Sequence, residues 1–295
     1  MRVLGSISVV LPVRNMPDHA QRCVDSIVGQ LRDGDQIVVV DDASDVPLGS
    51  VFDGSVANRI VVKRNAVAGG PYNARNIGAE LARTEFLLFV DARCRARPGL
   101  LDEHRRLLSQ PDVAMSCTET HTLSSSSVAS RLVAARQPFK VNNYVSVPGR
   151  LDYFPTANLG VRTEVFRRSG GFHNVRSGAD AEFCWRVQRN GYGRLGVSRA
   201  PLMDWVPRDT MRGLLSQFYR YGVSSVHLDS RVAGQRLVYS RRLRHTLRWL
   251  AQVFRTEGVS IPEAFGAIAL QLVYQAGRLR EKARVRFRAS DESRS

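Results

Sequence analysis

Four aspartates stand where predicted strands end or where a predicted helix begins, in positions suited to ligand binding or proton transfer. Asp41 and Asp42 close the segment QIVVVDDAS, Asp91 closes EFLLFVDAR, and Asp180 opens ADAEFCWRVQRNG. Carboxylates accept hydrogen bonds from N–H groups, bind hard divalent cations and act as general bases. The four acids are therefore the first candidates for a functional site.

The elements that must position these acids alternate between strand and helix over the first hundred residues. Continuous β-branched apolar runs predict buried strands, and apolar residues at helical spacing predict the helices between them. The predicted strands are 7–13, 36–44, 59–65 and 85–93, and the helices are 19–31, 69–83 and 98–108. This alternation predicts an α/β fold with a parallel, doubly wound sheet, in which ligands bind beyond the carboxyl ends of the strands.

The remainder of the chain divides into a second α/β half and a helical extension. Residues 153–172 are predicted to form a strand, a helix and a turn, and residues 179–191 a helix closed by glycine. From about residue 208 the pattern changes to arginine-rich helices. The expected domains are 1–207, with halves 1–110 and 111–207, a basic helical extension over 208–288, and a disordered tail over 289–295.

The charge balance indicates an anionic partner. The 295 residues include 43 basic and 27 acidic side chains, a net charge of +16, and only three of the basic residues are lysines. Residues 205–295 hold 17 basic and 7 acidic side chains, a surplus of 10. Nucleotide diphosphates, anionic lipid headgroups and nucleic acids all fit such a charge. Nucleic acid is not favoured, because no known module is visible and aromatics do not interleave with the basic runs.

The cysteine pattern and hydropathy indicate a cytoplasmic protein. Four scattered cysteines form no CxxC pair and no disulfide framework, which is typical of reduced thiols. The N-terminal apolar run contains Pro12 and Arg14 and is interpreted as a buried strand rather than a signal peptide. The longest apolar stretch, residues 264–276, is shorter than the ~20 residues that span a bilayer.

Five segments in this order resemble the family 2 glycosyltransferases with a GT-A fold. They are VVVDDAS, GGPYNARN, FVDAR, NLGVR and GADAEFCWR, and the resemblance covers roughly residues 6–221. Each segment is weak alone, and their order and spacing make the match specific. The resemblance implies an inverting enzyme that moves a sugar from a nucleotide-diphosphate donor, with UDP favoured, to a hydroxyl acceptor.

For the donor, the resemblance implies a nucleotide site at the ends of the first strands. Asp42 would accept a base N–H with help from Asp41, Arg75 would bring charge towards the base or phosphates, and Asn76 would buttress the site. The alternatives are a solvated Asx turn at Asp42 and an exposed arginine at a helix start. The full set implied for donor binding is Pro12, Arg14, Asp41, Asp42, Arg75, Asn76, Asp91 and Arg93.

The metal-binding DxD motif of the family reads Asp91-Ala92-Arg93 here, so its second acid is an arginine. Three interpretations stay open. Asp91 still binds Mn²⁺ or Mg²⁺ with the diphosphate, or the Arg93 guanidinium replaces the cation, or the site is inactive. The family often supplies a histidine ligand shortly before residue 217. DWVPRD offers Asp204 as a substitute.

On the acceptor side, the resemblance implies that Asp180 is the general base. The family's preceding acid is Ala179 here, which bears on acceptor binding. Asp180 could equally be a helix N-cap, and both roles can coexist. Asn158, Thr156, Glu182 and Trp185 are implied near the donor sugar or acceptor. The alternatives are a solvated Glu182 and a buried strand end with a satisfied amide at Asn158.

Two further features concern the C-terminal part. QFYRYG faintly resembles a motif of polysaccharide synthases, so Gln217, Arg220 and Tyr221 are lid candidates, with an ordinary helix turn as the alternative. The basic segment 264–285 is expected either to contact an anionic membrane near a lipid-linked acceptor, or to pack on the catalytic domain or a second copy. A catalytically silent homologue that binds nucleotide or glycan is the alternative to the enzyme.

Overall fold

The computed structural model describes residues 5–52, 57–175, 177–231 and 261–292, which fall into two compact units. The sheet unit comprises Met1–Thr122, Phe139–Val147 and Leu151–Val206. The helical unit comprises Leu123–Pro138, Pro148–Arg150 and Pro207–Ser295. Segment 123–138, which the sequence pattern places in the acceptor-binding half, therefore groups with the C-terminal helices.

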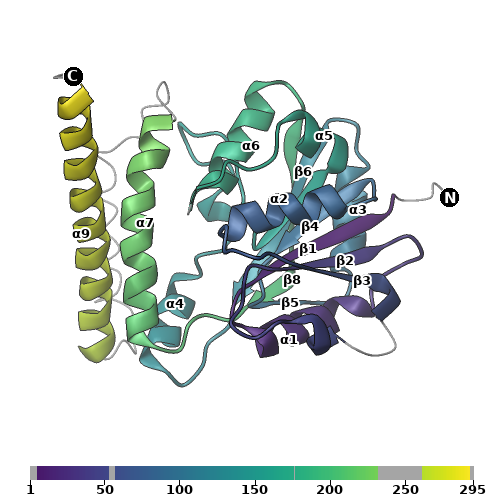
Figure 1. The fold of residues 1–295 in the computed structure, drawn as a ribbon, viewed down its shortest axis with the longest axis horizontal. Coiled ribbons are helices and arrows are strands. Elements are labelled where there is room, and N and C mark those ends of the chain that lie inside the picture. The colour runs from purple at the N-terminus through teal and green to yellow at the C-terminus, as the bar shows by residue number, and fades with distance from the viewer. Residues whose placement is uncertain (1–4, 53–56, 176, 232–260, 293–295) are drawn as a thin grey trace. The chain divides into compact units, whose positions relative to one another are not determined.

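The sheet unit is built on one mixed sheet of eight strands in the order β3-β2-β1-β4-β7-β6-β8-β5 (Figure 1). Its strands are β1 Ile7–Val13, β2 Gln36–Asp41, β3 Ile60–Arg64, β4 Phe86–Val90, β5 Cys94–Ala96, β6 Val113–Thr122, β7 Asn158–Arg162 and β8 Arg194–Trp205. Strands β1 to β4 pair in parallel, as predicted. β7 is antiparallel to both β4 and β6, so the second half of the sheet departs from the purely parallel pattern.

Helices cover both sides of this sheet. They are α1 Pro17–Val28, α2 Pro71–Leu81, α3 Leu100–Leu108, α5 Thr163–Arg168 and α6 Ala179–Arg189, with short 3₁₀ turns at Gly49–Phe52, Ala57–Arg59 and Val141–Asn143. Side chains from α2, α5 and α6 share one apolar core cluster with alternate residues of β4 and β7. Gly160 of β7 faces the opposite side, where His104 of α3 lies. Figure 1 shows α2 and α1 on opposite sides of the sheet.

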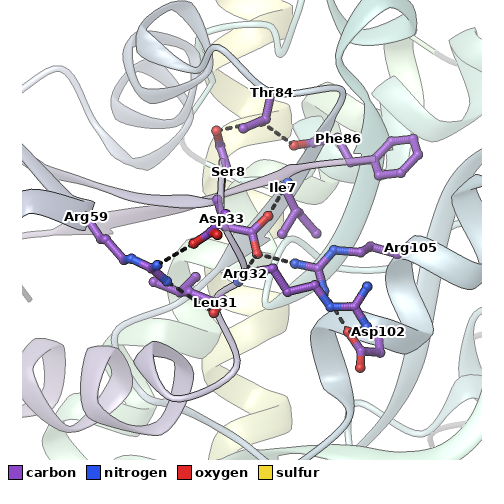
Figure 2. Close-up of polar contacts among 11 residues, drawn as sticks. Ile7, Ser8, Leu31, Arg32, Asp33, Arg59, Thr84, Phe86, Asp102 and Arg105 are labelled. Atoms are coloured by element: carbon purple, nitrogen blue, oxygen red, sulfur yellow. Dashed lines mark hydrogen bonds and ion pairs between the residues drawn. The ribbon is translucent and has the colours of Figure 1, made fainter. Parts of the chain in front are cut away.

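The amino-terminal edge of the parallel strands is held by a buried carboxylate. Asp35 accepts the Ile7 N–H at 2.8 Å and the Arg32 N–H at 2.6 Å, and it pairs with Arg105 of α3, which is fully buried. Figure 2 labels these three partners, Ile7, Arg32 and Arg105. A buried ion pair needs such additional hydrogen bonds to offset its desolvation. This network joins the start of β1, the turn before β2 and helix α3, at the end of the strands away from Asp41 and Asp91.

The helical unit contains α4 Val128–Arg136, α7 Met211–Arg231 and α9 Ile261–Glu292. Helices α7 and α9 pack so closely that a Cβ on Gly222 would lie 2.0 Å from the Tyr274 carbonyl oxygen, and one on Gly277 would lie 2.4 Å from the Tyr219 carbonyl oxygen. Across the described ranges, we find no helix with the length and apolar content needed to cross a bilayer.

The disordered tail expected over 289–295 is corrected in part. Helix α9 continues to Glu292, so residues 289–292 extend the preceding helix, and 293–295 lie outside the described residues.

Candidate active site

Asp41, at the end of β2, is a buried structural acid. Its carboxylate accepts the Ser44 N–H at 2.9 Å, the Leu48 N–H at 3.3 Å and Arg64 Nη1 at 2.6 Å. Burial raises the pKa of Asp41, but hydrogen bonds from Ser44, Arg64 and Leu48 outweigh it and leave the pKa lowered. Asp41 stays ionised and organises the turn that follows β2.

Asp42, the next residue, holds the glycine turn that leads into α2. Its Oδ1 accepts the Asn65 Nδ2 donor at 3.0 Å and the Gly69 N–H at 2.8 Å, and its Oδ2 accepts the Gly70 N–H at 2.9 Å. Gly70 has a φ of 90°, a conformation that favours glycine. Because Asp42 is 4% exposed and its carboxylate holds the Gly69–Gly70 turn, a ligand that binds this carboxylate must lie next to the turn.

Helix α2 carries a buried arginine towards the end of β4. Arg75 is 4% exposed, and its Nη2 lies 2.5 Å from Asp91 Oδ1. Its guanidinium also lies over the Tyr72 ring, 5.2 Å from the ring centroid. The Nε of Arg75 is buried and has no hydrogen-bond partner among the described residues. The Asp91 side chain is 37% exposed, so this ion pair faces solvent through its acidic partner.

Asp180 lies in the first turn of α6, where Gly178 precedes the helix with a φ of 89°. Its Oδ2 accepts the Thr156 N–H at 3.4 Å, its Oδ1 accepts the Ala181 N–H at 2.9 Å, and the Tyr72 hydroxyl donates to it. Burial raises the pKa of Asp180, although the Ala181 N–H, the Arg75 charge and Tyr72 act in the opposite direction. A carboxylate with a raised pKa is better suited to take a proton near neutral pH.

Three of the four aspartates that the sequence singles out, Asp42, Asp91 and Asp180, therefore contact α2 or the turn before it. The turn before α2 donates to Asp42, Arg75 pairs with Asp91, and Tyr72 donates to Asp180. The glycine turn and the start of α2, residues 69–75, thus contact segments that lie more than a hundred residues apart in the chain. This arrangement can hold an anionic ligand and accept a proton beside it.

The residues near Asp91 do not fit a metal site built from protein ligands. Arg93 stands where the second acid would be, and Asp204 is held by Arg97, with Nη2 to Oδ1 at 2.6 Å and Nε to Oδ2 at 2.9 Å. His121 Nδ1 lies 3.4 Å from the same Asp204 Oδ1. Among the residues that the structure describes, no three His, Cys, Asp or Glu side chains are grouped to hold a metal ion.

Two residues that were predicted near the donor sugar or acceptor have side chains buried in the core. Asn158 is fully buried, and its amide contacts His104 Nε2 at 2.8 Å, Thr118 Oγ1 at 2.8 Å and Thr120 Oγ1 at 3.0 Å. Trp185 is 2% exposed, and its Nε1 donates to the Leu151 carbonyl. The polar atoms of both side chains are hydrogen-bonded within the protein, and at Asn158 this matches the alternative of a buried strand end with a satisfied amide.

Thr156 and Glu182 are held by neighbouring residues. Thr156 is 4% exposed and meets Asp180 through its main-chain N–H. Glu182 pairs with Arg186, with Nε to Oε1 at 2.8 Å, and lies 3.0 Å from His173 Nδ1. Thr156 thus acts on the site through Asp180, while Glu182 belongs to an ion-pair cluster on α6.

The remaining predicted residues divide between the two units. Pro12 is partly buried near the end of β1, and Arg14 is exposed just after it. The Asn76 amide exchanges two hydrogen bonds with the Phe172 main chain, at 2.8 and 2.9 Å. The lid candidates lie within α7 of the helical unit and bond along that helix, Gln217 to Tyr221 at 2.6 Å and Arg220 to Ser216 at 2.7 Å.

Tyr72 is the site residue that the sequence did not reveal. It lies in GGPYNARN, where the glycines predict a turn and the arginine predicts a charged ligand contact. A tyrosine after a Gly-Pro turn does not by itself indicate a functional residue. Its 5% exposure and its contact with Phe172, at 5.4 Å between ring centroids, are typical of a core residue. Its hydroxyl, however, interacts with Asp180.

A mixed α/β sheet with carboxylates at the carboxyl ends of its parallel strands is the GT-A architecture of glycosyltransferases, and solved structures show the same fold. A mannosyltransferase from Pyrobaculum calidifontis, in complex with GDP-Man and Mn²⁺, aligns with 98% of this chain and 76% of its own at 17% identity and a TM-score of 0.58. GalNAc-T7 with UDP, GalNAc and Mn²⁺ aligns with 70% of this chain and 45% of its own at 15% identity and a TM-score of 0.53.

The sequence comparisons identify the family. The model described as "Glycosyl transferase family 2" matches residues 8–170, more than half of the chain, and the chain belongs to this family. A pre-mycofactocin glycosyltransferase of Mycobacterium tuberculosis is 28% identical over 221 residues, 70% of this chain and 46% of that protein. A poly(ribitol-phosphate) beta-glucosyltransferase of Bacillus spizizenii is 34% identical over 91 residues, 29% of this chain and 14% of that protein. The chain thus spans about half the length of the first of these relatives.

Proposed function

We propose that this chain is an inverting glycosyltransferase that moves a sugar from a nucleotide-diphosphate donor to a hydroxyl acceptor. The observation that carries the proposal is that the turn before α2, Tyr72 and Arg75 contact Asp42, Asp180 and Asp91 respectively. This places an acid for the nucleotide, a buried cation paired with the first acid of the DxD position, and a base for the acceptor around one helix.

The nucleotide is assigned to the side of Asp42. A nucleobase edge with an N–H donor, such as uracil, can donate to a lone pair of the carboxylate that Asn65, Gly69 and Gly70 leave open, whereas an edge without a donor there cannot. UDP is therefore the favoured donor nucleotide. The solved neighbours bind GDP-Man in one case and UDP in the other, so the base must be tested directly.

Asp180 is assigned as the base. As the acceptor oxygen attacks the anomeric carbon, a C–O bond forms on one face, and the bond to the nucleotide diphosphate breaks on the other. The acceptor proton passes to the Asp180 carboxylate, and the bonding electrons leave with the diphosphate. Direct displacement of this kind inverts the anomeric centre.

Neutralisation of the negative charge on the leaving diphosphate is assigned to the Arg93 guanidinium, a planar cation suited to phosphate oxygens. Arg93 occupies the position of the missing acid, and Arg75 already engages the acid that remains. The alternative is a divalent cation held by Asp91 and the diphosphate itself, which the Mn²⁺-bound neighbours favour. Such a cation would neutralise the same charge.

The test is transfer and donor hydrolysis by the purified protein across a panel of nucleotide sugars. Asp180→Asn keeps the size of the side chain and removes the base, and we expect turnover to fall by about 10²- to 10⁴-fold with donor binding retained. Asp18→Asn, at an exposed acid of α1, is the matched control and should leave turnover unchanged. Nucleotide-sugar binding without any turnover would favour the catalytically silent homologue.

A further inference from the structure

Helix α9 presents an apolar ridge to solvent. Phe265, Leu272 and Leu279 are 68%, 65% and 66% exposed, although side chains of this kind are usually covered. They are spaced seven residues apart, which places them on one face of the helix. Ala276 and Ala283, also exposed, lie along the same face.

The opposite face of α9 is packed within the helical unit. Ala264, Ala267 and Leu270 are buried, and Gly277 lies against the main chain of α7. At the start of α9, Glu263 pairs with Arg131 of α4 at 2.6 Å. The ridge is therefore the outer side of a helix whose inner side is already anchored.

The charges on α9 are strongly segregated. No charged residue occurs between Ala264 and Gly277. Beyond them, the exposed charges over residues 278–286 are all basic: Arg280, Lys282, Arg284 and Arg286. The two acids over 261–286, Glu263 and Glu281, are 9% and 5% exposed. An apolar ridge that continues into an exposed basic end has the character of a helix lying in the interface of an anionic bilayer.

We infer that the outer face of α9 binds the surface of a membrane containing anionic lipids, with Phe265, Leu272 and Leu279 entering the acyl boundary and the basic end meeting the headgroups. A second copy of the chain is the other occupant that an apolar ridge suits. It is disfavoured for two reasons. Parallel pairing would bring the two basic ends together, and antiparallel pairing would place each basic end against the uncharged stretch 264–277 of the other helix. In both cases, the described part of α9 up to residue 286 exposes no acid to complement the basic end. The inference concerns location and goes beyond glycosyl transfer.

Binding is tested by sedimentation of the full chain with vesicles of phosphatidylcholine, with and without phosphatidylglycerol. We expect binding only with the anionic lipid, weakening as salt is raised. Leu272→Ser with Leu279→Ser should weaken it by at least about tenfold, because each leucine loses its burial in the acyl boundary. The control is Val67→Ser, at an 80% exposed valine of the sheet unit, which should bind as the parent does.

Charge and oligomeric state complete the test. Arg280→Gln with Arg286→Gln should weaken binding to the anionic vesicles by about tenfold or more. Circular dichroism and donor hydrolysis should match the parent for every variant, so failure of vesicle binding is distinct from failure of the enzyme assignment. The inference is overturned if the parent does not bind anionic vesicles, if it binds neutral ones equally, or if the leucine variant binds normally. A leucine variant that changes only the molar mass in solution would identify a second copy as the occupant.

Discussion

Arg75 and Asp91 form an ion pair with Nη2 and Oδ1 2.5 Å apart, and the arginine is buried while the acid is partly exposed. The pair places a fixed positive charge directly behind the carboxylate that begins the degenerate DxD motif. A carboxylate already engaged by a guanidinium is a weaker ligand for a cation, because part of its charge is neutralised. Arg75 and Arg93 together give the DxD position a net positive charge, where two acids would give it a negative one.

The first prediction concerns how the diphosphate charge is neutralised. If Arg93 does so, a chelator should leave turnover largely intact, whereas Arg93→Ala should lower it by about 10²-fold or more, the scale of losing one transition-state charge partner. Steady-state rates with EDTA and with added Mn²⁺ provide the measurement. Asp204→Asn, at an acid held by Arg97, is the control and should not change the response to Mn²⁺. Strong inhibition by EDTA, reversed by Mn²⁺, would reject the arginine assignment in favour of the cation.

The second prediction concerns Tyr72 as a positioning residue for Asp180. Its hydroxyl donates to the carboxylate and so opposes the rise in the pKa of Asp180 that burial causes. Tyr72→Phe should raise that pKa further. Since the base must be ionised, the acidic limb of the kcat/KM profile should move to higher pH, by up to about one unit. The rate on the plateau at higher pH should change much less.

Tyr192→Phe serves as the control for this profile, because the Tyr192 ring packs against Arg168 rather than against Asp180. Its acidic limb should coincide with that of the parent. A Tyr72→Phe variant whose limb stays in place, or moves to lower pH, would show that the hydroxyl does not act on the base.

The first half of the fold follows from the sequence because its signals are local. Continuous apolar runs, rich in β-branched residues in β1 to β3, predicted β1 to β4, and the acids at their ends fell at one edge because parallel strands share a direction. The second half was harder to predict. β6 mixes threonines with a glutamate and a histidine in VAMSCTETHT, and its buried threonines face the polar network around Asn158. Such a strand lacks the continuous apolar pattern that identifies a buried strand.

The site divides in the same way. Asp42, Asp91 and Asp180 could be named from strand ends and from the family resemblance, because their type and position carry the signal. Tyr72 and the burial of Asn158 and Trp185 could not, because they depend on how α2, α3 and α6 pack on the sheet. A polar side chain in a matching motif gives no indication of whether its hydrogen bonds are already satisfied inside the protein.

The third prediction concerns the close packing of α2 against strands β1 and β2 at Gly78. A Cβ on Gly78 would lie 2.5 Å from Val10 Cγ1 and 3.3 Å from Val40 Cγ2. Gly78→Ala should therefore lower the free energy of unfolding by about 1–3 kcal/mol, measured by chemical denaturation. It should also reduce turnover, since the helix that carries Tyr72 and Arg75 must shift.

Adding Val10→Ala to this variant should recover part of the activity by making room for the new methyl group. Gly29→Ala is the control, because a Cβ at that position would meet no atom within 4 Å and the φ of −68° suits alanine. If Gly78→Ala leaves stability and turnover unchanged, α2 does not pack against Val10 and Val40 as closely as these distances indicate.

The fourth prediction concerns His104, whose ring nitrogens contact Ser116 Oγ at 2.7 Å and Asn158 Oδ1 at 2.8 Å. Burial lowers its pKa to about 4, despite its hydrogen bond to Asn158. In the unfolded chain a histidine has a pKa of about 6.5, so between these values the unfolded state binds the proton and the folded state does not. The stability due to neutral His104 is complete above about pH 6.5 and is lost as the pH falls towards 4.

This loss is measured as the pH dependence of the unfolding free energy in the parent and in His104→Gln. Between pH 7 and about pH 5, the parent should lose about 2 kcal/mol more than the variant, since the other titrating groups are common to both and cancel. His121→Gln, at a histidine whose side chain is 49% exposed, should follow the parent. Because His104 holds the Asn158 end of β7, and Thr156 just before it donates to Asp180, the same titration should loosen the base at low pH. If the unfolding free energies of the parent and His104→Gln change in parallel with pH, His104 is not held neutral in the folded protein. The proposed effect of its titration on Asp180 would then have no basis.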